Sequence, residues 1–177
     1  MTFDRLFTKA AVAICAVFTL SACATDAPLS QVDLALLDLV NPKVVDRHVV
    51  SGGQPSITDL AALKQKGFGT VISLRTEGED PGYDEAAEAE ALGLTYINIP
   101  VGVETGLDLE TAQLLRSTIA QSKAPALVHC GSGNRVGALY AIGAFEIDGK
   151  SLEEALAIGR DAGLTRLEPK VREILGQ

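Results

Sequence analysis

The chain has 177 residues, of which 47% are hydrophobic, and a formal net charge of −8. This length is sufficient for one domain of ordinary size with a substantial core. Because nucleic acids and anionic lipid surfaces bind clustered positive charge, the acidic balance, without any run rich in Lys and Arg, excludes both as expected partners. An acidic chain still binds phosphate at one focused site, so phosphate chemistry stays open.

The amino-terminal residues have the pattern of a bacterial secretion signal. Arg5 and Lys9 precede the apolar stretch 10–20, which is too short to span a bilayer and fits the hydrophobic region of a signal peptide. The motif Leu20-Ser21-Ala22-Cys23 follows, and it resembles the lipobox of bacterial lipoproteins. In a lipobox the cysteine is lipidated and becomes the first residue after cleavage. An ordinary signal peptide, cut beside this cysteine, is the alternative.

These patterns predict both the location of the chain and its division. We expect a lipoprotein signal peptide over residues 1–22, a lipid-anchored tether over 23–42 and one domain over 43–177. Ala24 is not an inner-membrane retention signal, so we expect a bacterial cell-envelope protein that faces the periplasm, anchored at the outer membrane by Cys23. Cys130 would then be the only free thiol in an oxidising compartment.

Hydrophobic periodicity and turn residues predict strands that alternate with helices. Strands are expected over 44–45, 48–50, 70–74, 95–99 and 126–130. Helices are expected over 57–66, 84–92, 109–122, 135–147, 151–161 and 169–176, and the segment 34–40 as a short helix or a lid. Ser56 and Ser151, each with an acidic residue three positions later, predict capping boxes.

This alternation predicts an α/β fold: a three-layer domain with a mostly parallel central sheet flanked by helices on both faces. Sites in such sheets lie at the carboxyl ends of the strands. Arg75, the loop 100–104 and Cys130 each follow a predicted strand, so we expect them to converge on one site.

The strongest candidate site is the motif His129-Cys130-Gly131-Ser132-Gly133-Asn134-Arg135, which joins a strand, a glycine-rich turn and a helix start. Backbone N–H groups and the positive helix end meet at such a turn, where they bind anions and favour a thiolate. Arg135 adds a planar fork of donors suited to a tetrahedral oxyanion. The motif therefore predicts a Cys130 nucleophile beside an anion cradle formed by Gly131, Ser132, Gly133 and Asn134.

This motif resembles the phosphate loop of cysteine-dependent phosphatases, the tyrosine and dual-specificity group. The stretches Val50–Ser56 and Val71–Arg75 are similar to a bacterial branch whose phosphatase-like domains also occur beside NAD kinase and beta-lactamase hydrolase-like domains. The resemblance runs from about Val44 to Gln177 and implies a dual-specificity-phosphatase-like fold. Some members of this branch are described as sulfurtransferases.

The resemblance implies a two-step reaction without a metal or another cofactor. The Cys130 thiolate attacks a phosphoryl group held by the loop and Arg135, and water then hydrolyses the cysteinyl-phosphate. His129 and Arg75 would be supporting residues, with His129 ordering the loop and favouring the thiolate. The implied partner is a phosphorylated small molecule or protein.

The sequence departs from the phosphatase pattern at three places. Four residues separate Cys130 from Arg135, one fewer than in those phosphatases and similar to the loop of rhodanese-type sulfurtransferases. Val136 stands where a hydroxyl residue usually follows the arginine. No Asp occupies the loop 101–107 after Pro100, so Glu104 is the expected general acid, and Asp108 is the poorer choice because it is expected to cap the next helix.

Three functions stay open on these residues. The first is a cysteine-based phosphatase, a phosphoric monoester hydrolase. The second is a sulfurtransferase that takes sulfur from a sulfane-sulfur donor and carries a persulfide on Cys130. The third is a non-catalytic anion-binding domain. The wider resemblance favours the phosphatase, whereas the loop length favours sulfur chemistry.

Overall fold

The computed structural model describes residue 34 and residues 37–122 and 125–176. A five-stranded sheet with the order β1-β2-β5-β3-β4 lies at its centre. The strands are β1 (Lys43–Val44), β2 (Val49–Gly52), β3 (Thr70–Ser73), β4 (Thr95–Asn98) and β5 (Ala126–His129). All neighbours pair in parallel except the edge strand β1, which is antiparallel to β2. The mostly parallel sheet is therefore confirmed.

Helices alternate with these strands, as the sequence predicts. They are α2 (Ile57–Gln65), α3 (Glu85–Ala91), α4 (Leu109–Gln121), α5 (Asn134–Glu146), α6 (Leu152–Asp161) and α7 (Glu168–Ile174). Both predicted capping boxes are present: the Ser56 hydroxyl accepts from the Asp59 N–H, and the Ser151 hydroxyl accepts from the Glu154 N–H. The Asp108 side chain caps α4 by accepting from the Thr111 N–H.

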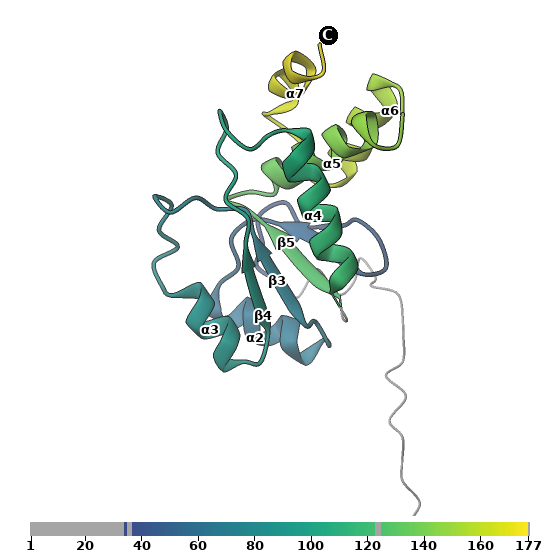
Figure 1. Ribbon diagram of the computed structural model, residues 1–177. Coiled ribbons are helices and arrows are strands. Elements are labelled where there is room, and N and C mark those ends of the chain that lie inside the picture. Colours follow the sequence, from purple (N-terminus) through teal and green to yellow (C-terminus); the bar gives the residue numbers. More distant parts are fainter. Residues whose placement is uncertain (1–33, 35–36, 123–124, 177) are drawn as a thin grey trace, which may run out of the picture.

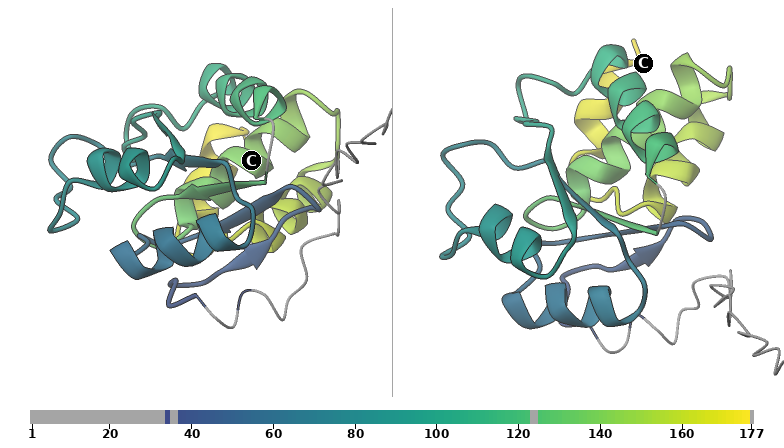
Figure 2. Two further views of the ribbon diagram at one scale, coloured as in Figure 1. Left: turned by 90° about the horizontal axis from the view of Figure 1, so that it is seen from below. Right: turned by 60° about the horizontal axis from the view of Figure 1, so that its bottom comes forward.

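Helices cover both faces of the sheet, which makes the fold a three-layer domain (Figures 1 and 2). The sheet separates two hydrophobic clusters. Consecutive strand residues point to opposite faces. Val49 and Val128 pack with α4, α5, α6 and α7, whereas their neighbours Val50 and Leu127 pack with α2 and α3. Both faces of the sheet are thus buried, which explains why its central strands read as continuous apolar runs.

The three strand ends expected to converge do meet. β5 lies between β2 and β3, so the residue after His129 leaves the sheet at its centre. The Leu74 N–H donates to the His129 carbonyl at 2.8 Å, and the Val101 N–H donates to the Leu74 carbonyl at 3.1 Å. These hydrogen bonds hold together the segments that follow β3, β4 and β5, at the carboxyl end of the sheet.

The predicted signal peptide over 1–22, Cys23 and most of the predicted tether lie outside the described residues. Within the described part, Leu37 and Leu39 are buried in the cluster on the α2 side of the sheet. The Asp38 N–H donates to Asp59 Oδ1 at 2.9 Å, so the residues before β1 pack onto the domain. None of the described helices combines the length and apolar character that a membrane span requires.

Candidate active site

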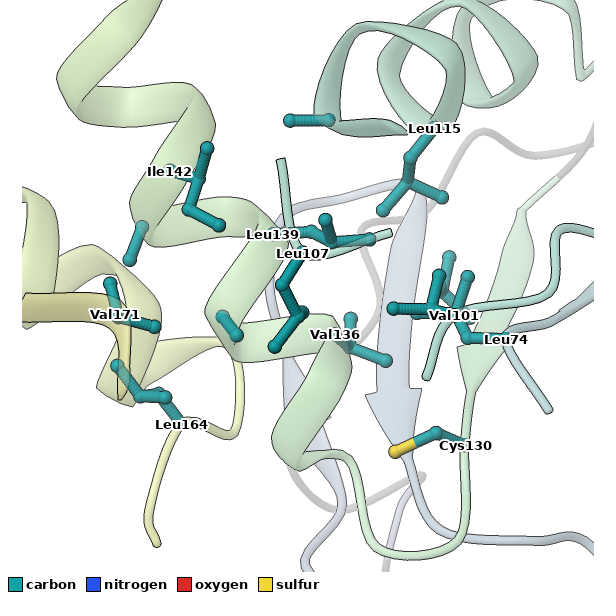
Figure 3. Packing of buried hydrophobic residues seen from close by; sticks show 14 of the residues in the cluster. Leu74, Val101, Leu107, Leu115, Cys130, Val136, Leu139, Ile142, Leu164 and Val171 are labelled. Atoms are coloured by element: carbon teal, nitrogen blue, oxygen red, sulfur yellow. The ribbon is translucent and has the colours of Figure 1, made fainter. Parts of the chain in front are cut away.

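Cys130 lies at the carboxyl end of the central strand, on the face of the sheet covered by α5. It is 1% exposed and belongs to the hydrophobic cluster on that face. Figure 3 shows it at the edge of the cluster, with its sulfur directed from β5 toward the first turn of α5. Cys130 also lines a cleft of about 750 Å³.

The loop after Cys130 turns directly into α5. Gly133, the residue that precedes the helix, has a φ of 77°, a left-handed conformation that favours glycine. It provides no side-chain cap, so the N–H groups of the first turn of this 13-residue helix are left for another acceptor. The amino terminus of α5 therefore presents donors and a positive dipole end to an anion beside Cys130.

Arg135 is held at the cleft by a carboxylate that the sequence does not single out. Its Nη1 donates to Glu79 Oε1 at 2.6 Å, and its Nη2 donates to Glu79 Oε2 at 2.6 Å. Nη1 also donates to the Val101 carbonyl at 2.7 Å. These bonds use the end of the guanidinium fork and fix its plane, and the hydrogen bonding to Glu79 raises the pKa of Arg135.

The side of the same fork remains open. No carboxylate or carbonyl among the described residues accepts from Arg135 Nε, and the fork faces Cys130, whose interaction with it contributes to the raised pKa of Arg135. Nε and Nη2 form a second pair of parallel donors, the arrangement that binds two oxygens of a phosphate. Glu79 therefore orients Arg135 without using the donors that an oxyanion needs.

Glu79 comes from the acidic loop after β3, 56 positions before Arg135 in the sequence. Its Oε1 accepts from the N–H and the hydroxyl of Thr76, at 3.0 and 3.1 Å. The hydrogen bond from Arg135, opposed by burial and aided by Thr76, lowers the pKa of Glu79 from 4.5 to about 2. Glu79 is thus an anion at neutral pH.

Arg75, predicted as a supporting residue, reaches this network only indirectly. Its Nη1 donates to Gln54 Oε1, and its Nε lies 3.7 Å from Glu79 Oε2. Arg75 does not line the Cys130 cleft but a neighbouring pocket, and the two share Thr76 and Glu79. Arg75 therefore contacts and helps to position Glu79, the carboxylate that orients Arg135.

Two other predicted residues, His129 and Asn134, lie beside Cys130 and Arg135, but their side chains contact other groups. The His129 ring is on the opposite face of the sheet from Cys130, buried, with Nε2 3.0 Å from Glu85 Oε1. Asn134 Oδ1 accepts from the N–H groups of Thr165 and Leu167, at 2.8 and 3.4 Å. His129 and Asn134 thus support the loop from behind.

Glu104, the predicted general acid, does not line the cleft, although Gly102 and Val103 from the same loop do. Its side chain is 79% exposed, and Oε2 lies 3.4 Å from Lys170 Nζ. The carboxylate that does line the cleft is Glu79. Within residues 37–122 and 125–176, no group of three or more His, Cys, Asp or Glu is placed to hold a metal ion.

The pair between Glu79 and Arg135 predicts a pH-dependent stability. A carboxylate whose pKa is lowered by folding stabilises the folded state above its unfolded pKa of 4.5, and this contribution is lost as the pH falls toward 2. The gap in unfolding free energy between wild type and Glu79→Gln should be about 2 kcal/mol larger at pH 6 than at pH 2.5.

Urea unfolding followed by circular dichroism at several pH values measures this gap. Glu77→Gln is the matched control, because Glu77 is an exposed carboxylate of the same loop. At pH 6 it should change the unfolding free energy less than Glu79→Gln does, because no ion pair is lost with it in the described residues. A Glu79→Gln gap that does not shrink on acidification contradicts the ion pair.

Comparison with known proteins places this geometry in a family. The family model described as "Beta-lactamase hydrolase-like protein, phosphatase-like domain" matches residues 43–146. The beta-lactamase hydrolase-like protein of Xylella fastidiosa is 34% identical over 128 residues, which are 68% of this chain and 29% of that protein. The protein of the same name from Agrobacterium fabrum is 31% identical over 103 residues, 56% of this chain and 24% of that protein. The chain thus spans less than a third of the length of these relatives.

Solved structures support the same fold. A candidate phosphatase of Neisseria meningitidis has a TM-score of 0.62 at 20% identity, over 75% of this chain and 96% of that one. TpbA of P. aeruginosa, a Cys-to-Ser variant in complex with pTyr, has a TM-score of 0.58 at 16% identity, over 77% of this chain and 83% of that one. This chain therefore belongs to the family of phosphatase-like domains of beta-lactamase hydrolase-like proteins, and its fold is that of the cysteine-dependent, dual-specificity-like phosphatases.

Proposed function

We propose that this chain is a cysteine-dependent phosphatase that hydrolyses phosphate monoesters through a cysteinyl-phosphate on Cys130. The observation that carries the proposal is that Cys130 and Arg135 line the same cleft, at the uncapped start of α5. A nucleophile and preorganised donors for the oxygens of a phosphoryl group are the two elements that this chemistry requires.

The first step transfers the phosphoryl group to sulfur. The thiolate of Cys130 forms a bond to phosphorus while the bond from phosphorus to the ester oxygen breaks. Arg135 and the first-turn N–H groups of α5 stabilise the negative charge on the equatorial oxygens. In the second step, water attacks phosphorus and the bond from phosphorus to sulfur breaks, which releases inorganic phosphate and a proton to solvent and regenerates the thiolate.

The residues at the cleft favour esters whose oxygen leaves without protonation. Glu79 is ionised at neutral pH because its pKa is about 2, so it does not donate a proton to the leaving group. A phenoxide leaves more readily than an alkoxide, because phenols are far more acidic than aliphatic alcohols. An aryl phosphate is therefore the proposed substrate class, and the complex of TpbA with pTyr supports it.

The test is turnover of para-nitrophenyl phosphate by the domain, with phosphoserine as the alkyl comparison. We expect release of nitrophenolate, inhibition by vanadate, and slower turnover of phosphoserine. Rapid acid quenching followed by mass spectrometry should detect one phosphoryl group on the peptide that contains Cys130. Absence of turnover between pH 5 and pH 8 would overturn the proposal.

A rhodanese-type sulfurtransferase is the second candidate function, and one observation favours it. Four residues separate Cys130 from Arg135, which makes a smaller cradle than the phosphatase loop. The Cys130 thiolate would attack the outer sulfur of thiosulfate, expel sulfite and hold a persulfide, whose terminal sulfur passes to cyanide as thiocyanate. A sulfur mass gain on Cys130 and formation of thiocyanate, without phosphate release, would select this reaction.

We also propose that the chain is a lipoprotein of the bacterial cell envelope, anchored through Cys23 and facing the periplasm at the outer membrane. The basic start, the short apolar stretch and the sequence Leu20-Ser21-Ala22-Cys23 support this location. Incorporation of labelled palmitate that is lost in Cys23→Ser is the expected result.

A further inference from the structure

A second arginine lines the Cys130 cleft, and the proposed reaction does not use it. Arg166 lies in the connection between α6 and α7 and borders the cleft together with Arg135. We propose that Arg166 forms a second anion subsite, so that the preferred substrate is an aryl phosphate with a further anionic group, a carboxylate or a second phosphate. This inference rests on the proposed function and narrows its substrate class.

Arg166 differs from three other cations on the last two helices because no acidic side chain of the described residues pairs with it. Arg160 and Arg172 both contact Glu168, at 2.7 and 3.1 Å, and Lys170 lies 3.4 Å from Glu104. No carboxylate of the described chain lies within ion-pair distance of Arg166. Glu168 and Glu104 are thus paired with other cations, and the Arg166 guanidinium is available to an anion that enters the cleft.

Arg166 also supplies positive charge that the pair of Glu79 and Arg135 does not provide. Glu79 compensates the charge of Arg135, so that pair alone offers donors but little net positive field to a phosphate dianion. The chain as a whole carries a formal charge of −8, which repels anionic ligands. Arg166 is the cleft-lining cation without compensation in the described residues, and it makes the cleft locally attractive to a ligand with more than one anionic group.

The backbone around Arg166 is fixed relative to the nucleophilic loop. Asn134 lies directly before Arg135, and its Oδ1 accepts from the N–H groups on both sides of Arg166, those of Thr165 at 2.8 Å and Leu167 at 3.4 Å. Asn134 is 6% exposed, which shields both hydrogen bonds from water. The arrangement holds Arg166 at a defined place beside Arg135 and leaves only its side chain free to move.

The rest of the cleft suits a carbon framework between the two anionic groups. Val103, whose residue exposure is 47%, and Leu167 contribute apolar surface to the cleft wall. A cleft of about 750 Å³ accommodates much more than one phosphate group. A phosphorylated ring with a carboxylate substituent fills these requirements: phosphate at Cys130, ring between Val103 and Leu167, carboxylate at Arg166.

The experiment compares phenyl phosphate with 4-carboxyphenyl phosphate as substrates of wild type and Arg166→Gln. The ratio of kcat/KM for the carboxylated probe to kcat/KM for phenyl phosphate should fall about tenfold in Arg166→Gln, because one charge-assisted contact is lost. Comparing ratios removes the intrinsic difference between the two leaving groups. In wild type the ratio should also decline as salt concentration rises.

Arg47→Gln is the matched control, because it removes the same charge from an exposed site before β2, at the opposite end of the parallel strands from Cys130. Its ratio should equal that of wild type. An equal loss on both probes in Arg166→Gln would show that Arg166 binds the reacting phosphate instead, and an unchanged ratio would show that it binds no anion. Either result overturns the second subsite.

A binding measurement separates this inference from the proposed reaction. If wild type turns over neither probe, the proposed function fails, but the subsite is still tested by calorimetric titration of both probes into wild type and Arg166→Gln. Tighter binding of 4-carboxyphenyl phosphate that disappears in Arg166→Gln would support the subsite alone. Equal affinities of the two probes for wild type would overturn it. Phosphotyrosine peptides with acidic or neutral neighbours then distinguish a protein substrate from a small molecule.

Discussion

Cys130→Ser is expected to reduce turnover of para-nitrophenyl phosphate by roughly 10⁴-fold or more. A serine hydroxyl is not ionised at neutral pH and is a far weaker nucleophile than a thiolate. The change replaces one atom of a side chain that is 1% exposed, so the packing around it should persist. Steady-state release of nitrophenolate measures the loss, and circular dichroism checks that the fold is retained.

The same variant should keep its affinity for phosphate, because the donors of Arg135 and α5 are untouched.

Arg135→Lys is the complementary variant: it keeps the thiol but removes the planar fork that contacts Glu79 and the oxyanion together. We expect it to lose about 10²-fold to 10³-fold in kcat and to bind phosphate more weakly. Retention of a tenth of the activity in Cys130→Ser would contradict a cysteinyl-phosphate mechanism.

Local sequence patterns were sufficient to predict the architecture. The capping box at Ser56 and the N-cap at Asp108 use contacts between residues three positions apart, which a sequence displays directly. The convergence of the loops after β3, β4 and β5 follows from the rule for parallel sheets rather than from any single residue. Local sequence also predicts that Cys130 and Arg135 share one site, because the two residues flank one turn.

Glu79 could not be predicted in the same way. In the sequence it is one of several acids in the loop after Arg75, and its contact with Arg135, 56 positions later, depends on how the chain folds. The pattern Thr76 to Glu79, with a hydroxyl residue three positions before the acid, is the one local signal for its fixed position. Selecting it over Glu77 required the position of Arg135, which only the tertiary structure gives.

The side-chain direction of His129 follows from strand alternation, although its motif position suggests otherwise. Val128 and Cys130 point to the α5 side of the sheet, so the residue between them must point to the α2 and α3 side. There it meets Glu85, at the start of α3. His129 therefore contributes its backbone to the site rather than its ring: its carbonyl accepts a hydrogen bond from the Leu74 N–H.

Gly137→Ala is expected to destabilise the domain by at least about 2 kcal/mol, despite the better helix propensity of alanine. A Cβ at this position of α5 would lie 2.0 Å from the Leu164 nitrogen and 2.5 Å from the Gly159 carbonyl oxygen. Both atoms are backbone, so no rotamer change relieves the clash, and α6 with its following turn must move. The helix propensity gain of about 1 kcal/mol is smaller than this cost. The midpoint of urea unfolding measures the effect.

Gly78→Ala is the matched control, because a Cβ there would meet no atom within 4 Å, and it should change the unfolding free energy by less than about 0.5 kcal/mol. The clash at Gly137 also bears on the site. The turn after α6 continues into Thr165, Arg166 and Leu167, which Asn134 ties to the nucleophilic loop. Any Gly137→Ala protein that still folds should therefore show altered selectivity between phenyl phosphate and its carboxylated analogue. An unchanged unfolding midpoint would mean that α5 and α6 do not touch backbone to backbone at this glycine.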